Sequence, residues 1–353
     1  MKQGRSLSEL AKELERQAAS KRDFKVPTQE LEFIPPTEDQ NLTVGINGFG
    51  SFSPSPIFHD QVGTYAGVPA KYYDRMLAEA PDLLTLNVNH WLRAKTETRL
   101  VRTLDGNARA FLSNRYRAID NYDVADAVLP VLVQNGSGLR VESCEITDRR
   151  LYLKAVSERI EGTVKGQPVQ AMISISNSEV GLGAFRIEFG IFILACLNGA
   201  IMPEEGMRRY HVGRAGDEFD AAYEVFSDPT RQADDRALKL KMADVVRAAF
   251  DAPRFQAMLN GIALTERNKI TRNPAEVISK VVEEYALPER AEGGILRHLI
   301  TGGDLTQWGL SNAVTAYAQE TEHNYEQATD LEKVGGKILT IKPEAWEKIA
   351  LAA

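Results

Sequence analysis

Cysteine and long apolar runs are both scarce in this chain. Its 353 residues include only two cysteines, Cys144 and Cys196, too few for a disulfide framework or a cysteine-based zinc site. The most apolar run, residues 191–197, is far shorter than the roughly 18 residues that a membrane-spanning helix needs. No apolar signal region follows the N-terminal segment. We therefore expect a soluble, cytoplasmic protein that does not enter a membrane.

Catalytic motifs are missing as well. No serine lies in a Gly-x-Ser-x-Gly elbow, and Glu204 and Glu205 are adjacent, so they point apart rather than share a proton. The glycine-rich stretch that begins at Gly45 continues into Pro54 and Pro56 rather than into a phosphate-binding helix. We expect no catalytic residue and no cofactor. A metal-dependent nuclease assembled from distant carboxylates stays open as an alternative.

The histidines do not form a ligand pattern in the sequence. No two of them are four residues apart, and none sits in a cluster with the spacing of a zinc site. The five are His59, His90, His211, His298 and His323. The sequence therefore predicts no metal.

Hydrophobic periodicity predicts an α+β fold. A helix capped by Ser6 or Ser8 opens the chain, and prolines and glycines predict extended or looped chain over residues 24–56. Residues 97–103 and 108–117 read as a β-hairpin around a turn at residues 105–107. An antiparallel meander follows, with strands expected over residues 139–146, 151–156, 169–176 and 184–194. Helices are expected over residues 57–65, 81–94, 122–133, 236–250, 274–285, 291–300, 305–318 and 343–352, and another from Pro69.

The same patterns suggest three regions. We expect an N-terminal helix over residues 1–23, an α+β core over residues 24–260, and a mostly helical C-terminal region over residues 261–353. Gly261 and Pro274 punctuate the chain near the last boundary.

Charge is unevenly distributed along the chain. The net charge is −7, which argues mildly against a dedicated nucleic-acid binder. Residues 91–117, however, hold seven Lys or Arg against two acids, whereas residues 317–332 hold five acids and no Lys or Arg. The distribution predicts a basic face and an acidic end.

The basic hairpin is the strongest candidate site. If its second strand reaches residue 117, strand alternation places Arg115 and Arg117 on one face. Such a row of guanidinium groups can neutralise phosphates, and nearby aromatic rings such as Tyr116 can stack bases. The candidate DNA-binding residues are Arg93, Lys95, Arg99, Arg102, Arg109, Arg115, Tyr116 and Arg117, with Arg208 and Arg209 from a second basic cluster. The competing interpretation is a solvated face whose arginines pair with acids elsewhere in the chain.

Three blocks of sequence resemble a phage- and plasmid-associated family known as domain of unknown function 932. They are residues 68–73, residues 109–120, and the set 173–178, 185–189 and 195–198. The resemblance spans roughly residues 40–260. The chain departs from the family in the third block, where Ser178-Glu-Val-Gly replaces a common His-Asp-Gly and residues 191–196 replace an Arg-Val-Val-Cys type of strand.

The resemblance implies a place in the DNA metabolism or host interaction of a mobile element. A meander followed by helices, with a basic hairpin, is similar in outline to ring-forming single-strand annealing recombinases of the Rad type. We therefore expect an ATP-independent protein that binds and anneals single-stranded DNA, as a homo-oligomeric ring or filament. The rival hypothesis is a non-enzymatic structural or anti-defence protein that acts on host proteins.

Overall fold

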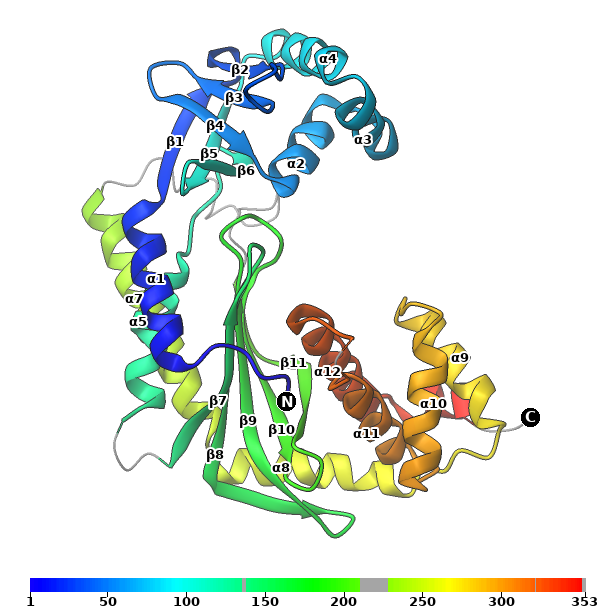
Figure 1. Ribbon diagram of the computed structural model, residues 1–353. Helices are drawn as coiled ribbons and strands as arrows, with labels where there is room; N and C mark the ends of the chain where they lie inside the picture. Colours follow the sequence, from blue (N-terminus) through cyan, green and yellow to red (C-terminus); the bar gives the residue numbers. More distant parts are fainter. Residues whose placement is uncertain (135–137, 210–227, 321, 351–353) are drawn as a thin grey trace.

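The computed structural model describes residues 1–134, 138–209, 228–320 and 322–350. It confirms the α+β class, with two mainly antiparallel sheets and a helical C-terminal region (Figure 1). The N-terminal sheet and its helices lie at one end, the second sheet lies in the middle, and the C-terminal helices stand beside the second sheet (Figure 1).

The N-terminal sheet has six strands in the order β1-β5-β6-β4-β3-β2. Its pairs are antiparallel except for β4 and β6, which run parallel. The strands are β1 (Arg22–Pro27), β2 (Leu31–Ile34), β3 (Thr43–Ile46), β4 (Gly50–Pro54), β5 (Thr98–Leu104) and β6 (Asn107–Ser113). Residues 24–56 are thus largely extended, as their prolines and glycines predict.

Three helices cover one face of this sheet: α2 (Pro56–Ala66), α3 (Ala70–Glu79) and α4 (Pro81–Ala94). Proline opens α2 and α4, where its fixed φ suits the first turn and its missing N–H costs no hydrogen bond. Phe58 and Leu84 from the helices pack against Val101 and Phe111 from the hairpin, and all four are buried. Their burial anchors the hairpin β5–β6 to the helices.

The second sheet has five strands in the order β11-β10-β9-β8-β7, all antiparallel. They are β7 (Leu139–Ile146), β8 (Leu151–Val164), β9 (Gln167–Asn177), β10 (Phe185–Ile193) and β11 (Asn198–Arg209). The first four confirm the predicted meander. The fifth, β11, was not predicted, because Pro203 and the acids after it interrupt the apolar alternation that marks a strand.

One face of the second sheet is covered by α1 (Leu7–Ser20), α5 (Asn121–Leu132) and α7 (Asp228–Ala249). Ser6 caps α1 as predicted, and its hydroxyl accepts the backbone N–H of Glu9 while the Glu9 side chain accepts the Ser6 N–H. Leu10, Leu14 and Met242 then contribute to the same buried cluster as the sheet residues Ile173 and Ile187.

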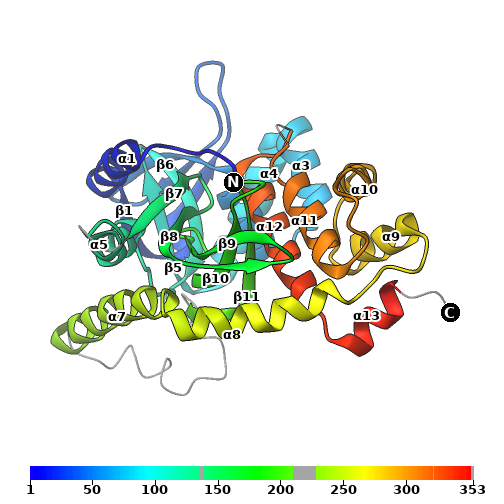
Figure 2. The ribbon, with the colours of Figure 1, turned by 90° about the horizontal axis from the view of Figure 1, so that it is seen from below.

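Some of the helices that follow contact the second sheet, and the others pack against one another in a separate helical cluster. Figure 2 shows α8 (Ala252–Ala263) continuing from α7 along one side of the molecule. The remaining helices are α9 (Pro274–Glu284), α10 (Ala291–Gly302), α11 (Gln307–Tyr317), α12 (Tyr325–Leu339) and α13 (Pro343–Ala350). Neither α8 nor α12 was predicted. Two mid-helix glycines weaken the pattern of α12. At Gly336 a Cβ would lie 1.8 Å from the carbonyl oxygen of Ile201, so glycine lets the helix approach β11.

A row of polar residues crosses the face of the second sheet that α12 covers. Ser143, Lys154, Ser174 and Glu188 are register neighbours on four successive strands, and all are buried. The Lys154 ammonium donates to Glu332 of α12 at 2.5 Å, and both side chains are fully buried. Burial lowers the pKa of Lys154, and the Glu332 carboxylate opposes that effect. This ion pair therefore ties α12 to the sheet.

Within the described ranges, no helix is long and apolar enough to cross a membrane.

Replacing Lys154 with Met should lower the free energy of unfolding by about 3–5 kcal/mol, because it leaves the Glu332 carboxylate buried without a counter-charge. The double variant Lys154→Met/Glu332→Leu should recover most of that loss, since an apolar pair needs no desolvated charge. Urea denaturation followed by circular dichroism measures both. Arg247→Met, which breaks an exposed pair with Asp244, is the control and should change stability by less than about 1 kcal/mol. A Lys154→Met loss as small as the control's would contradict the prediction.

Candidate functional site

The predicted hairpin exists, but its second strand is shorter than expected. β6 ends at Ser113, and the backbone N–H of Tyr116 then donates to the Ser113 carbonyl at 3.0 Å in a turn. Arg115 and Arg117 therefore do not share a strand face, contrary to the prediction from alternation. Asn114 has the side chain that favours such a turn, which is the signal that could have ended the strand earlier.

Arg102 lies in the interior of the protein, with 0% of its side chain exposed. Its guanidinium donates to the Asp23 carboxylate at 2.9 Å, to the Asp120 carboxylate at 2.7 Å and to the Glu179 carbonyl at 3.0 Å. Burial opposes the charge, yet the carboxylates outweigh it and raise the pKa of Arg102. Arg102 is thus a structural cation, out of reach of a phosphate in solvent.

Arg109 and Tyr116 complete this polar junction between the two sheets. Arg109 pairs with the Glu179 carboxylate, which also accepts the backbone N–H of Asn121 at 2.6 Å. The Tyr116 hydroxyl donates to the Ser178 carbonyl at 2.9 Å, and its ring is buried. Tyr116 therefore cannot stack on a base in this structure.

The other predicted residues are dispersed. Arg93 pairs with Glu32 at 3.1 Å, and Arg99 pairs with Glu97 at 2.7 Å. Lys95 and Arg99 both lie over the ring of Tyr65, at 5.0 and 4.5 Å from its centre.

Three further predicted cations lie apart from these. Arg117 pairs with Asp234 and Asp235 in the first half of α7. Arg115 and Arg208 are exposed. The side chain of Arg209 lies outside the part of the structure that is described.

A groove of about 500 Å³ opens beside the junction, and the sequence did not reveal it. It lies between α1, the β5–β6 turn and the β7–β8 turn. Its cationic lining residues are Arg5, Arg16, Arg109 and Arg149, and we call it the arginine groove. Three acids, Glu13, Asp105 and Asp148, also line it, so the lining carries four bases against three acids. Only Arg109 of the four was predicted as a site residue.

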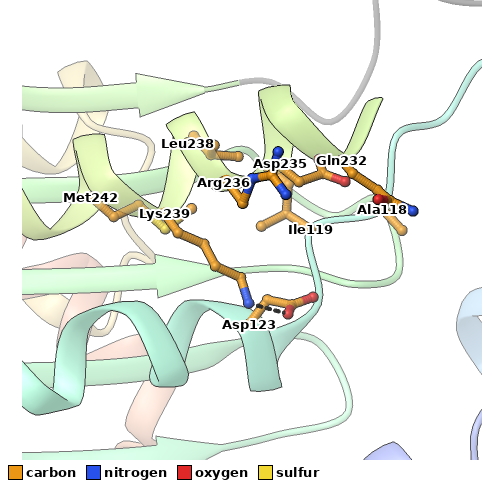
Figure 3. Close-up of a pocket in the computed structure, with 9 residues that line it drawn as sticks. All are labelled: Ala118, Ile119, Asp123, Gln232, Asp235, Arg236, Leu238, Lys239 and Met242. Atoms are coloured by element: carbon orange, nitrogen blue, oxygen red, sulfur yellow. Dashed lines mark ion pairs between the residues drawn. The ribbon is translucent and has the colours of Figure 1, made fainter. Parts of the chain in front are cut away.

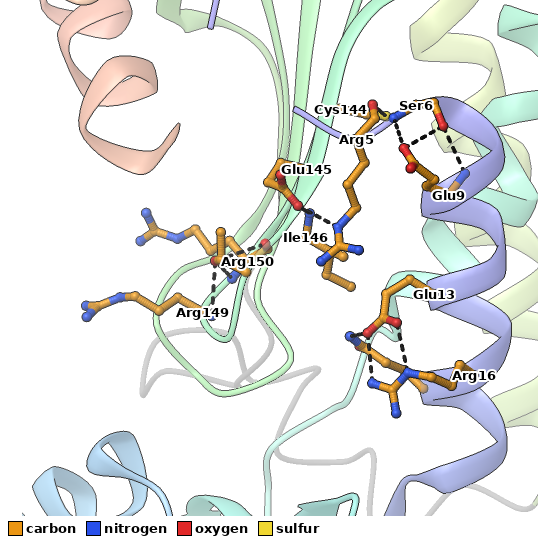
Figure 4. Close-up of polar contacts among 12 residues, drawn as sticks. Arg5, Ser6, Glu9, Glu13, Arg16, Cys144, Glu145, Ile146, Arg149 and Arg150 are labelled. Atoms are coloured by element: carbon orange, nitrogen blue, oxygen red, sulfur yellow. Dashed lines mark hydrogen bonds and ion pairs between the residues drawn. The ribbon is translucent and has the colours of Figure 1, made fainter. Parts of the chain in front are cut away.

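Figure 4 shows where three of these arginines lie, and the Arg149 guanidinium extends away from α1. Arg5 and Arg16 come from the α1 side, and Arg149 comes from the turn opposite. Arg16 pairs with Glu13 at 2.8 Å and Asp105 at 2.7 Å, and Arg5 pairs with Glu145 at 2.7 Å. The side chains of Arg5, Arg16 and Arg149 are 40%, 48% and 56% exposed, so their ion pairs are solvated and weak.

A smaller cavity of about 350 Å³ lies between α5 and α7 (Figure 3). Lys239 of α7 projects into it and pairs with Asp123 at 2.8 Å, while Ile119, Leu238 and Met242 supply an apolar wall. It holds no pairing of a nucleophile with a base among the described side chains. Its ion pair joins the two helices.

The fold and the groove define an α+β protein in which a polar junction joins two sheets, with a cationic groove beside it. The family described as "Domain of unknown function (DUF932)" matches residues 110–335, well over half of the chain, and the chain belongs to that family. The match starts later and ends later than the span of residues 40–260 that the sequence blocks suggested. No curated protein and no solved structure matches the chain.

The junction should make stability depend on acid pH through Asp120. Burial alone would raise the pKa of Asp120, but Arg102 and Lys21 outweigh it and lower that pKa. The unfolded carboxyl, with a pKa of about 3.9, then binds protons more readily than the folded one. The stabilisation is therefore present above about pH 4 and is lost as pH falls through the lowered folded pKa.

Asp120→Asn should lower the free energy of unfolding by about 2–3 kcal/mol at pH 7, because Arg102 loses a charged acceptor. It should also flatten the loss of stability between about pH 5 and pH 3. Urea titrations across that range measure both effects. Asp244→Asn, in an exposed pair with Arg247, serves as the control. An Asp120→Asn profile parallel to the wild-type profile would count against the assignment.

Proposed function

We propose that the protein binds single-stranded DNA through its phosphates and promotes annealing without ATP, and that the arginine groove is the binding surface. The observation that supports this proposal is that three exposed arginines, Arg5, Arg16 and Arg149, line one groove. Arginine forms bidentate, charge-assisted hydrogen bonds with phosphate oxygens. The proposed interface thus differs from the hairpin row that the sequence suggested.

The existing ion pairs do not prevent phosphate binding at these arginines. Exposed pairs are worth about 0–1 kcal/mol, so a phosphate can replace a carboxylate partner at small expense. Arg102 is different, because removing its partners would leave its charge buried without a counter-charge. The exposed arginines are therefore the ones that we assign to DNA.

The lining of the groove also suggests the mode of recognition. Ser55, Asn107 and Thr147 add neutral hydrogen-bonding side chains, and the lining includes no aromatic ring. Tyr116, which was expected to stack bases, is buried, and so is Phe111 of the same hairpin region. Binding through phosphates alone is independent of sequence and depends steeply on salt. An oligomer in the bacterial cytoplasm would join several grooves into a longer cationic track and would offset the net charge of −7.

The test is a salt titration of affinity for a labelled single-stranded oligonucleotide, measured by fluorescence anisotropy from about 50 mM salt upward. Removing two phosphate contacts in Arg5→Ala/Arg149→Ala should reduce the slope of log affinity against log salt by about 1.4, at about 0.7 per contact. Sedimentation with and without the oligonucleotide should show an assembly that forms or grows on DNA.

Arg75→Ala is the matched control for this experiment. Arg75 is exposed and pairs with Glu79 on α3, away from the groove lining. Its slope should equal that of the wild type. The absence of any affinity at about 50 mM salt, where a phosphate interface is strong, would overturn the proposal, as would equal slopes in all three proteins.

A second candidate function, binding of a host protein, is favoured by an apolar surface on α3 and α4. Leu83 and Leu86 are three residues apart, and His90 follows Leu86 by four, so they line one side of α4, and all three are exposed. Tyr72 and Trp91 are exposed on the same two helices. Clustered exposed apolar side chains mark interaction sites more often than scattered ones do.

Under this second candidate, Leu83→Asp/Leu86→Asp should abolish a defined complex isolated from bacterial lysate and leave DNA affinity unchanged. Ile300→Asp, a change at an exposed apolar residue of α10, is the control and should retain the complex. Equal retention by both variants would exclude this surface as the docking site.

A further inference from the structure

Three potential metal ligands meet where α11 turns toward α12. One carboxylate oxygen each from Glu320 and Glu322 and one ring nitrogen of His323 lie within 4.8 Å of one another. In the described part of the chain, no other set of three His, Cys, Asp or Glu side chains brings its ligand atoms this close together. The sequence pattern of paired histidines does not reveal this group, because it combines one histidine with two nearby acids.

The His323 ring is the observation that distinguishes this group from an ordinary acidic cluster. Its side chain is 5% exposed, and its Nε2 atom has no hydrogen-bond partner in the described structure. Nε2 faces the Glu322 carboxylate at 3.7 Å, beyond hydrogen-bonding distance. A buried ring nitrogen without a partner is costly, and a metal ion would satisfy it.

The neighbouring side chains hold the ligands as an outer shell would. The Tyr317 hydroxyl donates to the Glu322 carboxylate at 3.2 Å, and its ring packs edge-on against His323 with centroids 4.5 Å apart. The Nε2 atom of His298, in α10, lies 2.8 Å from the Glu320 carboxylate. Histidine–carboxylate contacts of this kind orient ligands around protein-bound metals. Arg297 also pairs with Glu320, so it would compete with a cation.

The geometry points to a binding site for a divalent transition-metal ion, best matched by Zn²⁺, formed by Glu320, Glu322 and His323. Two ligand atoms of a tetrahedral zinc lie about 3.3 Å apart, given bonds of about 2.0 Å. The separation of 3.7 Å between His323 and Glu322 needs only a small closure. An imidazole ligand favours zinc over Mg²⁺ or Ca²⁺, which prefer oxygen ligands alone.

A bound ion would join two helical segments of the C-terminal region. Glu322 and His323 precede α12, which the Lys154–Glu332 pair ties to the second sheet, and Glu320 contacts α10 through His298. His323 also lines a cavity of about 390 Å³, while Glu322 is 60% exposed, so an ion can enter from solvent. The role that follows is structural: the ion would fix the α11–α12 corner, which His298 links to α10.

The test is titration of the full-length, chelator-treated protein with Zn²⁺ by calorimetry, with Co²⁺ absorption as a report of coordination geometry. One ion should bind per chain, and the melting temperature should rise with its concentration. Glu322→Gln removes a proposed ligand at an exposed position. It should weaken Zn²⁺ binding by more than about 10-fold, because the loss of a partner that only supports a ligand already weakens binding by at least that much. His298→Asn should weaken it by about 10–100-fold.

Two further variants separate metal binding from a general loss of stability. Arg297→Ala should tighten Zn²⁺ binding, because it removes the cation that competes for Glu320. His90→Ala, at an exposed histidine of α4, should bind as the wild type does. Absence of Zn²⁺ binding in the wild type would overturn the inference, and so would equal binding by wild type and Glu322→Gln. Equal affinity for Mg²⁺ would overturn the assignment to a transition metal.

Discussion

The guanidinium of Arg102 has no access to water, and separate parts of the chain meet on it. Asp23 comes from β1, Asp120 directly precedes α5, and the Glu179 carbonyl belongs to the turn after β9. A buried cation without partners would cost several kcal/mol, so the N-terminal sheet and the second sheet hold the positions that satisfy it. The arginine groove lies beside this junction because Arg109, on the neighbouring strand β6, contributes to both.

Buried charges and their partners also position the helices on the face of the second sheet that α12 covers. A buried row of serine, lysine and glutamate side chains would be unstable under an apolar helix. α12 covers it with Thr329, Glu332 and Lys333, which are matched to the row in charge and hydrogen bonding. The C-terminal helices are therefore tied to the sheet by polar complementarity as well as by the apolar cluster around Trp308.

The basic stretch at residues 91–117 and the acidic stretch at residues 317–332 each pair with charges from other parts of the chain. Arg117 pairs with acids of α7, Lys154 pairs with Glu332, and Arg149 lies 3.5 Å from Glu326. These partners are more than 100 residues apart along the chain. The candidate site was therefore predicted only in part: Arg109 lies at the groove, whereas Arg5, Arg16 and Arg149 were not identified, because nothing in their local sequence marks them.

The sequence by itself determined the class of the fold and most of its elements. Apolar periodicity, the Ser6 cap and the proline at Pro81 are local signals, and local backbone preferences obey them. The family block at residues 109–120 contains Arg109, Tyr116 and Asp120 of the junction, whereas Asp23, Arg102 and Glu179 lie outside the blocks. Only the tertiary structure decided which charges are buried. Nothing in the neighbouring sequence distinguishes Arg102 from Arg149. Their roles differ because Arg102 is enclosed by carboxylates from distant segments, whereas Arg149 faces water.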